Sequence, residues 1–512
     1  MERTAGFDVV ILGGGTAGCV LAARLSEDPS VSVGLIEAGP DYGSWDEGRW
    51  PEDILDARSL PPSHGWGFED SNASRARIIG GCSSHNACFV VWGHPMDYDA
   101  WSDPTDREWT FETLEPHLRR AERMLRTRIH GQDELGPWDK ALLKAADELG
   151  YPAPENLNDL SFLEAAAPYP VNAAKEVRWN TAFAYLDAGR GRKNLQILDR
   201  TLVDRLVIED GKASSIRLIR YEQSTELFAK TVILAAGAYG SPAILLRSGV
   251  GPEDDLRRVG ISPVLPMPGV GRRLKDHCGS WLEFEPTDRL RNETTEHAKE
   301  GRVWQSASVL KARSGVNDVG YWDIQLYPWT DALPEAPGAP PSFQFYLAVK
   351  LQKVASMGSV RLASANPADL PIVEHGFLAE SEDRQRLVEG MKLGRRIAQA
   401  GAMRRVAVEV DPGMDVSSNE GLDRFVGSHL AGHFHPVGTC RMGPQNDLMA
   451  VTDSRGKLHG VENVYVADAS IFPDLPRANT NLTVVAVAER IADSLLDIGP
   501  ASDPGPNDEG TP

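Results

Sequence analysis

Cysteines and long apolar runs are scarce in this sequence. The 512-residue chain has five cysteines at irregular spacing: Cys19, Cys82, Cys88, Cys278 and Cys440. An odd, scattered set argues against a disulfide framework, and without a CxxC pair the chain has no metal-binding cysteine motif. No apolar stretch approaches the roughly 20 residues of a membrane span, and the N-terminus lacks the pattern of a secretory signal. We therefore expect a cytoplasmic protein with no membrane partner.

Basic side chains are also in deficit. Lys and Arg total 53 against 73 Asp and Glu, which gives a net charge of −20. An acidic surface disfavours nucleic acid as a partner and is compatible with a cationic substrate, although excess acid most often serves solubility. The apolar fraction of 41% is typical of a globular protein, and the length predicts about two or three domains. Residues 499–512 are rich in Pro, Gly and acid, so we expect a disordered tail.

The first forty residues follow the order strand, turn, helix, strand. Apolar residues predict a buried strand at 7–12, a helix at 16–26 and a second strand at 31–37. The turn after the first strand carries G-x-G-x-x-G, and the helix N-terminus behind it favours phosphate groups. This combination predicts a dinucleotide site, but it does not distinguish NAD from FAD.

Each glycine of that turn has a separate physical role in the prediction. Gly13 permits the tight turn, Gly15 lets the backbone approach a pyrophosphate, and Gly18 allows the helix to pack close to the strand. Glu37 ends the second strand, where a carboxylate can bind a ribose hydroxyl.

Six later segments carry a family resemblance. They are 80–86 (GGCSSHN), 237–252, 269–277 (GVGRRLKDH), 433–443 (HFHPVGTCRMG), 464–473 and 478–492. Together with the N-terminal turn they resemble the glucose–methanol–choline (GMC) oxidoreductases, FAD-dependent alcohol oxidases and dehydrogenases, and most of all the choline oxidase-like members. The resemblance spans about residues 5–497. It implies an α/β fold, with a Rossmann-like FAD-binding domain on a parallel sheet and a substrate domain with an antiparallel sheet covered by helices.

The implied domains are interleaved along the chain. The FAD-binding domain would come from 1–155, 195–280 and 430–498, and the substrate domain from 156–194 and 281–429. Strands of the substrate domain are expected at 280–286, 321–329, 342–350 and 358–364, covered by a helix at 386–401. Within the second FAD stretch, Asp210-Gly211 between two apolar runs indicates a type I′ hairpin.

The resemblance also implies the residues that bind FAD. Val203 would contact the adenine through its main chain, and Asp468 would bind cofactor hydroxyls. Asn481 would lie at the flavin pyrimidine edge, near the start of a helix, or would simply cap that helix. The full set is Gly13, Gly15, Thr16, Ala17, Gly18, Glu37, Ala38, Gly80, Gly81, Ser84, His85, Asn86, Val203, Ala236, Asp468, Ala469 and Asn481.

His85 is unusual within its glycine-rich run. Glycines and small hydroxyls suit close approach to phosphates, but a histidine does not follow from that need. Most GMC members have a small or aliphatic residue here, whereas choline oxidase has a histidine bonded to the 8α carbon of the flavin. We therefore expect a covalent flavin bond through His85, and the alternative is an unlinked histidine hydrogen-bonded beside the flavin.

Alcohol oxidation removes a proton from oxygen and a hydride from carbon, so the site needs a base of near-neutral pKa. The family motif places His435 in that role, with His433 as the competing candidate. Asn479 matches the second catalytic position, where an amide would orient the alcohol and stabilise the alkoxide.

The substrate is the least defined part of the prediction. Candidate contacts are Trp304, Gln305, Asp323 and Tyr346, with Glu283 and Glu285 as further carboxylates. Gln305 stands where choline oxidase has an acid, so a polar primary alcohol such as an amino alcohol or an aminoglycoside-like amino sugar is preferred to choline. An aryl alcohol is the alternative substrate. Two alternative functions are an oxynitrile lyase-like activity and a flavin-binding structural role. The electron acceptor, oxygen or another, stays open, and a homodimer is compatible with the sequence.

Overall fold

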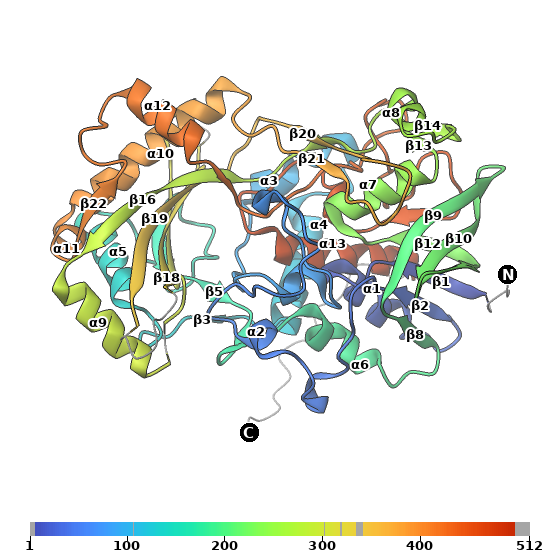
Figure 1. The fold of residues 1–512 in the computed structure, drawn as a ribbon, viewed down its shortest axis with the longest axis horizontal. Helices are drawn as coiled ribbons and strands as arrows, with labels where there is room; N and C mark the ends of the chain where they lie inside the picture. The colour runs from blue at the N-terminus through green and yellow to red at the C-terminus, as the bar shows by residue number, and fades with distance from the viewer. Residues whose placement is uncertain (1–5, 106, 302, 318–319, 334–340, 497–512) are drawn as a thin grey trace.

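The computed structural model describes residues 6–105, 107–301, 303–317, 320–333 and 341–496. The tail expected at 499–512 therefore lies outside the described residues. The two largest sheets of the described chain are of different kinds and lie at opposite ends of the molecule in Figure 1. Within the described part, no helix combines the length and apolarity that a membrane crossing requires.

A five-stranded parallel sheet confirms the predicted strand, turn, helix, strand order. Its strands lie in the order β24 (Val464–Val466), β12 (Ala229–Leu234), β1 (Phe7–Leu12), β2 (Val33–Ile36) and β8 (Leu195–Leu198). The central strand β1 is paired on both sides, with Val10 opposite Val232 and Gly34. Such a strand is shielded from water on both faces, which explains its unbroken apolar run.

Helices from the two ends of the chain pack together beside this sheet. Helix α1 (Thr16–Leu25) follows β1, and α13 (Thr480–Leu495) is the last described helix. Arg24 of α1 forms buried ion pairs with Glu489 and Asp493 of α13. Figure 1 shows both helices side by side at the middle of the molecule.

Between β8 and β12 the chain forms an antiparallel meander, β9 (Thr201–Glu209), β10 (Lys212–Arg220) and β11 (Gln223–Leu227). Asp210 and Gly211 at its first turn have φ angles of 47° and 74°. Two positive φ angles define the type I′ turn, so the predicted hairpin is confirmed.

The second sheet has seven antiparallel strands. Their order is β22 (Ala407–Asp411), β16 (Cys278–Pro286), β19 (Phe343–Leu351), β18 (Ile324–Ala332), β17 (Ser308–Ala312) and β4 (Ala165–Pro168), with β23 (Ala431–Gly432) also paired to β16. The expected strand at 358–364 forms elsewhere: β20 (Gly358–Arg361) lies in a three-stranded sheet with β15 (Arg272–Leu274) and β21 (Ile372–Glu374).

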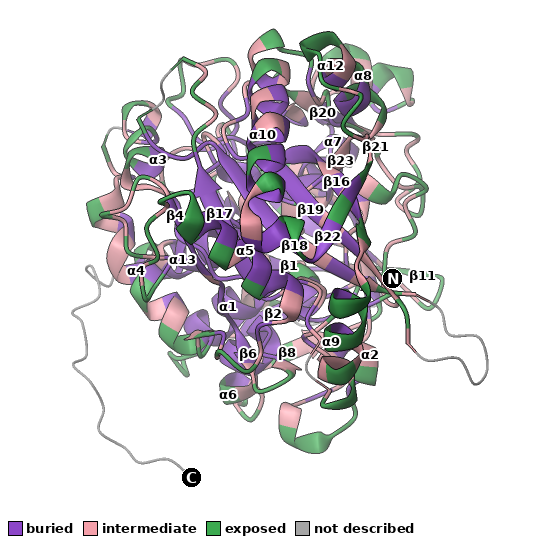
Figure 2. Cartoon of the chain, turned by 90° about the vertical axis from the view of Figure 1, so that its left-hand side faces the viewer, coloured by how far each residue is buried: buried purple, intermediate pink, exposed green. Residues whose placement is uncertain are grey.

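Two helices cover one face of the antiparallel sheet, α10 (Ser381–Gln399) and α5 (Pro137–Glu148). Figure 2 looks onto this face and shows both helices in front of buried strands. A Cβ atom on Gly394 of α10 would lie 3.2–3.5 Å from Leu282, Val349 and Leu326, so the helix packs closely on the sheet. Trp138 of α5 packs edge-on against Phe284 and Phe345.

These contacts place α5 with the antiparallel sheet, although it belongs to the stretch 1–155 assigned to the FAD-binding domain. The domain boundaries themselves remain predictions. The face opposite the helices carries the alternate residues of the strands, among them Tyr327 and Lys350. We call it the inner face, because it is directed toward the histidines described below: Tyr327 Oη lies 3.1 Å from His433 Nε2.

Candidate active site

The N-terminal turn has the geometry expected of a phosphate-binding loop. Gly13 has a φ of 113°, and a Cβ atom there would lie 2.6 Å from the Ala235 carbonyl oxygen. A Cβ on Gly18 would lie 1.9 Å from the Gly13 carbonyl, so only glycine lets α1 pack against this loop. At Gly15, by contrast, the nearest atom lies 3.8 Å away. Space therefore remains beside Gly15 at the N-terminus of α1, where backbone N–H groups favour an anion.

The loop at 80–86 docks directly on this turn. The Gly80 amide donates to the Gly14 carbonyl at 2.7 Å, and a Cβ on Gly81 would lie 2.6 Å from Gly15 Cα. The Ser84 hydroxyl donates to the Ile79 carbonyl, so it is used within the loop. The two predicted glycine-rich segments are thus neighbours.

Glu37 is held at the end of β2 by two backbone amides. Its Oε2 accepts from Gly14 at 2.9 Å and its Oε1 from Gly39 at 2.7 Å. Burial raises the pKa of this carboxyl to about 7, against the opposing effect of those two hydrogen bonds. The carboxyl group therefore lies against the turn, and its role as a ribose ligand stays a prediction. Neighbouring Ala38 accepts a hydrogen bond from Arg77.

The start of α13 also reaches this turn. The Thr16 hydroxyl donates to Asn481 Oδ1 at 3.3 Å, while Asn481 Nδ2 is buried and has no partner in the described structure. Ala17 is buried in α1. The expectation that Asn481 caps α13 is wrong: the helix begins at Thr480, its N-cap position is Asn479, and the Asn479 side chain makes no capping bond.

The turn after β12 also lies beside the N-terminal turn, because Ala235 is next to Gly13. Asp468 Oδ2 accepts from the Gly237 amide at 2.8 Å and from the Ser241 hydroxyl at 2.6 Å. Ser241 in turn accepts from the Ala236 amide, and Ala469 accepts from the Gly438 amide. Val203 lies further along, in β9, and its carbonyl accepts from Arg247 at 3.1 Å.

His85 has one ring nitrogen engaged. Its Nε2 lies 2.7 Å from the Ser63 carbonyl, which can only accept, so Nε2 carries the proton. Burial lowers the pKa of this imidazole, which favours the neutral ring with a lone pair on Nδ1. The adjacent Asn86 accepts from the Cys88 amide. A neutral, half-buried imidazole has the nucleophilic form that a covalent bond to flavin would need.

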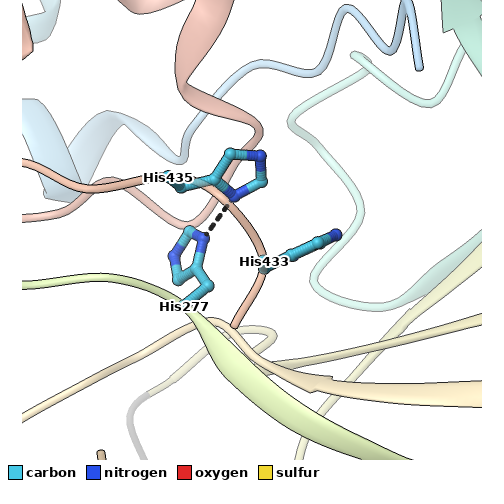
Figure 3. Close-up of side chains that lie close together, drawn as sticks. All are labelled: His277, His433 and His435. Carbon is cyan, nitrogen blue, oxygen red and sulfur yellow. Dashed lines mark hydrogen bonds between the residues drawn. The ribbon is translucent and has the colours of Figure 1, made fainter. Parts of the chain in front are cut away.

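Three histidines form a buried cluster, which Figure 3 shows. His277 Nδ1 and His435 Nδ1 lie 3.0 Å apart, and the rings of His433 and His435 are 4.4 Å apart between centroids. Two backbone segments distant in sequence hold them together. Lys275 and Val437 exchange a pair of backbone hydrogen bonds, and the His433 amide donates to the His277 carbonyl at 2.8 Å.

The hydrogen bonds of this cluster determine which nitrogen of His435 is free. His277 Nε2 lies 3.1 Å from the Gln352 carbonyl, so Nε2 carries the proton. Burial lowers the pKa of His277 to about 3, so the ring is neutral and its Nδ1 has a lone pair. That lone pair accepts from Nδ1–H of His435, which leaves the lone pair of His435 on Nε2.

Asn479 forms a hydrogen bond with this second nitrogen of His435. Its Nδ2 lies 3.3 Å from His435 Nε2, and its Oδ1 is buried without a partner in the described residues. His433 differs from His435, because its Nε2 is engaged by the Tyr327 hydroxyl at 3.1 Å and its buried Nδ1 has no partner in that part of the chain. The structure thus brings the predicted base and the predicted amide into contact.

The charges around His435 are mixed. Asp276 Oδ1 accepts from the His435 amide at 2.7 Å, and Arg75 lies 3.9 Å from the same carboxylate. Burial raises the pKa of Asp276 to about 7, which the arginine opposes. The pKa of His435 lies well below its ordinary value, because of burial first and then His433, His277, Arg75 and Lys350. The imidazole is therefore neutral, as a base must be.

The side chains of the four predicted substrate residues mostly contact other residues of the protein. Asp323 is held by the Ser314 amide and hydroxyl and by Arg386, so its carboxylate is used in a structural network. Gln305 accepts from the Leu60 amide and donates to Asp331. Trp304 is buried against His130, and the Tyr346 hydroxyl donates to Gln344. Of the other carboxylates, Glu285 pairs with Arg291 and points into solvent.

Several residues of the site were not assigned from the sequence. His277 and Asp276 lie in a segment that carried the family resemblance, but no role was attached to them. Tyr327, Lys350 and Gln352 come from strands or strand ends of the second sheet, where the sequence alone does not say which face meets the histidines.

The residues around the first turn fit an FAD molecule. A dinucleotide needs backbone approach at its phosphates, and the space at Gly15 provides it. The buried polar atoms Asn479 Oδ1 and Asn481 Nδ2, both without partners in the described residues, stand at the N-terminus of α13. A helix N-terminus and free amides suit the pyrimidine edge of a flavin, which becomes negative on reduction.

Comparisons with known proteins identify the family of the chain. Family models described as GMC oxidoreductase match residues 7–279 and 354–488. The chain is 32% identical to an oxygen-dependent choline dehydrogenase of Proteus mirabilis, over 96% of both chains, and 30% identical to the human mitochondrial choline dehydrogenase, over 96% of this chain and 89% of that one. Its fold is similar to the crystal structure of pyridoxine 4-oxidase from Mesorbium loti, with a TM-score of 0.83, 30% identity, and coverage of 96% and 100% of the two chains. The predicted resemblance is confirmed, and the chain belongs to the GMC oxidoreductase family of FAD-dependent oxidoreductases.

Proposed function

We propose that this protein oxidises a polar primary alcohol to its aldehyde, with His435 as the base that takes the hydroxyl proton. The observation that carries this proposal is the bond from His435 Nδ1 to His277, which leaves the lone pair on His435 Nε2 beside Asn479. FAD, when bound, supplies the hydride acceptor at its N5 atom. A protein side chain must remove the proton of the alcohol oxygen.

Asn479 is proposed to position the alcohol oxygen. Its amide can donate a hydrogen bond to a developing alkoxide, and it lies within 3.3 Å of the base. Arg75 and Lys350 add positive charge near the same place, which also favours an alkoxide. His433 is proposed to have a supporting role, because its Nε2 is held by Tyr327.

The residues proposed to hold FAD are those around the first turn, with the phosphates beside Gly15 and the α1 N-terminus. We further propose that His85 is bonded to the flavin. Its neutral ring and the lone pair on Nδ1 support this, since a carbonyl already fixes the proton on Nε2. A permanent bond would prevent cofactor loss and raise the reduction potential.

Two kinds of polar alcohol are supported by different observations. An amino alcohol or amino sugar is supported by Asp331, a half-buried carboxylate that binds Gln305 and Trp329. An aryl alcohol is supported by the rings of Tyr327 and Trp329 on the inner face, and by the similarity to pyridoxine 4-oxidase. The names of the choline dehydrogenase relatives make oxygen a candidate acceptor. A homodimer and a cytoplasmic location stay predictions.

An anaerobic screen of alcohols tests the proposal. Flavin absorbance should bleach with at least one polar or aromatic primary alcohol, and aldehyde should form in equal amount. Matched amines and neutral isosteres in the same screen compare the two substrate kinds. A chain that releases cyanide from a cyanohydrin without bleaching would be oxynitrile lyase-like instead, and one inert to both would indicate a flavin-binding structural role.

A further inference from the structure

Lys350 is a buried cation that no ion pair in the described structure neutralises. It lies on β19 with 6% of its surface exposed, and no hydrogen bond or ion pair joins its ammonium to any described residue. Burial lowers its pKa to about 8, so the side chain is still largely protonated at neutral pH. Buried charges are normally paired, because removal from water is costly. A ligand is one way to supply the missing partner.

The stem of Lys350 runs toward the catalytic histidines. Lys350 pairs with Gly279 of β16, and a Cβ atom at Gly279 would lie 2.8 Å from Lys350 Cδ. Gly279 is in turn paired with Ala431, two residues before His433. After burial, Lys350 is the strongest influence that lowers the pKa of His433, and it also lowers that of His435.

Gln325 stands next to Lys350 on the inner face. The two residues are directly opposite each other on β18 and β19, so their side chains share one face. Gln325 is fully buried, and neither Oε1 nor Nε2 has a hydrogen-bond partner in the described residues. An amide donor beside an ammonium is a suitable pair of donors for one oxyanion.

Positive charge predominates on this part of the inner face. Lys311, opposite Gln325 on β17, is also buried, although its ammonium donates to the Leu157 carbonyl and lies over the Trp322 ring. The acid that acts on Lys350, Asp276, already accepts from the His435 amide and lies near Arg75. This arrangement opposes a cationic group next to the base and favours an anionic one.

We propose that Lys350 and Gln325 form a subsite for an anionic group of the substrate, a carboxylate or comparable oxyanion, beside His433 and His435. The subsite refines the proposed function and rests on it, because it takes the alcohol at His435 as given. The preferred substrate is then an acidic alcohol, and a simple amino alcohol such as choline would meet Lys350 as a like charge.

Binding of simple aromatic probes tests the subsite without turnover. Benzoate, benzamide and benzylamine would be titrated into the oxidised holoenzyme, with the change in the visible flavin spectrum as the signal. Benzoate should bind at least about tenfold more tightly than benzamide, since a charged hydrogen bond is stronger than a neutral one, and benzylamine most weakly. K350M should abolish the difference between benzoate and benzamide, K350R should keep part of it, and Q325L should reduce it. K144M, which removes an exposed lysine on α5, should change nothing.

The outcomes separate the subsite from the proposed function. Equal affinity for benzoate and benzamide, or an unchanged ratio in K350M, would overturn the subsite. If K350M does not accumulate as folded holoenzyme, the test rests on the ratio of benzoate to benzamide affinity in the wild type and in Q325L. Anaerobic bleaching by 4-(hydroxymethyl)benzoate and 4-(hydroxymethyl)benzamide gives the second arm. Equal bleaching by both refutes the subsite alone, whereas tight benzoate binding without bleaching by any alcohol refutes alcohol oxidation and leaves the subsite standing.

Discussion

The Nδ1 atoms of His277 and His435 are joined by a hydrogen bond of 3.0 Å, in which His435 is the donor. Because the Gln352 carbonyl fixes the proton of His277 on Nε2, the direction of the bond follows from a backbone group. The tautomer of His435 is thereby determined by a backbone carbonyl two hydrogen bonds away from its ring.

Replacement of His435 by alanine should slow flavin reduction by at least about 10²-fold, the usual contribution of a general base. Flavin content should change little, because the side chain contacts His277 and Asn479. Stopped-flow absorbance under anaerobic conditions measures the rate. H433A is the matched control, and a larger loss in H433A than in H435A would assign the base to His433.

His277 is expected to act as a positioning residue. H277L removes the acceptor for His435 Nδ1–H, so the ring can adopt the wrong tautomer, and flavin reduction should fall by about tenfold or more. In H277Q the amide oxygen can accept from His435 while the amide nitrogen donates to Gln352, so part of the rate should return. Equal rates in H277L and H277Q would argue that His277 only fills space.

The pH dependence of flavin reduction follows from the lowered pKa of His435. The active form is the neutral imidazole, and burial holds its pKa well below the ordinary value of about 6.5. The rate should therefore stay constant as pH falls through 6.5 and should decline only in more acidic buffer. A midpoint at or above the ordinary histidine value would show that burial does not lower the pKa of His435 in the working enzyme.

A covalent bond between His85 and the flavin is expected to survive denaturation. Acid-precipitated protein should stay yellow, and its intact mass should exceed the chain mass by about 0.8 kDa, the size of FAD. H85A should release its flavin on denaturation. Colourless precipitated wild-type protein with the bare chain mass would refute the bond and leave His85 as a hydrogen-bonded neighbour.

Two glycines of the first turn should respond differently to alanine. A Cβ atom at Gly15 has no neighbour closer than 3.8 Å, and its φ of −77° is open to any residue, so G15A should fold but lose flavin. At Gly18 the same atom would lie 1.9 Å from the Gly13 carbonyl, so G18A should reduce the thermal stability of the apoprotein. Flavin absorbance per chain and apoprotein melting temperature separate the two effects. Normal flavin content in G15A would place the phosphates elsewhere.

The elements built from local patterns were predictable. The limits of β1 and α1 follow from an apolar run and a glycine turn, and both agree with the structure within one residue. The start of α13 was not, because Asn479, Thr480 and Asn481 are all good capping residues. Only the fold shows that Asn479 turns its amide to His435 while Asn481 meets Thr16.

The substrate face was predictable only in part. Strands β16, β18 and β19 were expected, but their alternate residues are apolar or mixed on both faces, so the sequence does not say which face meets the histidines. Asp323 illustrates the difficulty. Its partner Arg386 lies 63 residues away on α10, and this contact takes the carboxylate out of the expected role.

The ion pairs of Arg24 with Glu489 and Asp493 have a consequence for the synthesis of the protein. They join helices at the two ends of the described chain, and the edge strand β24 at Val464–Val466 also comes late. On the ribosome, the strand and helix that begin the nucleotide fold must therefore wait for their partners until β24 and α13 have emerged. Because α13 begins beside Asn479 and contains Asn481, we infer that FAD is captured only once this helix has been synthesised, by a chain that has kept its first helix only partly covered until then.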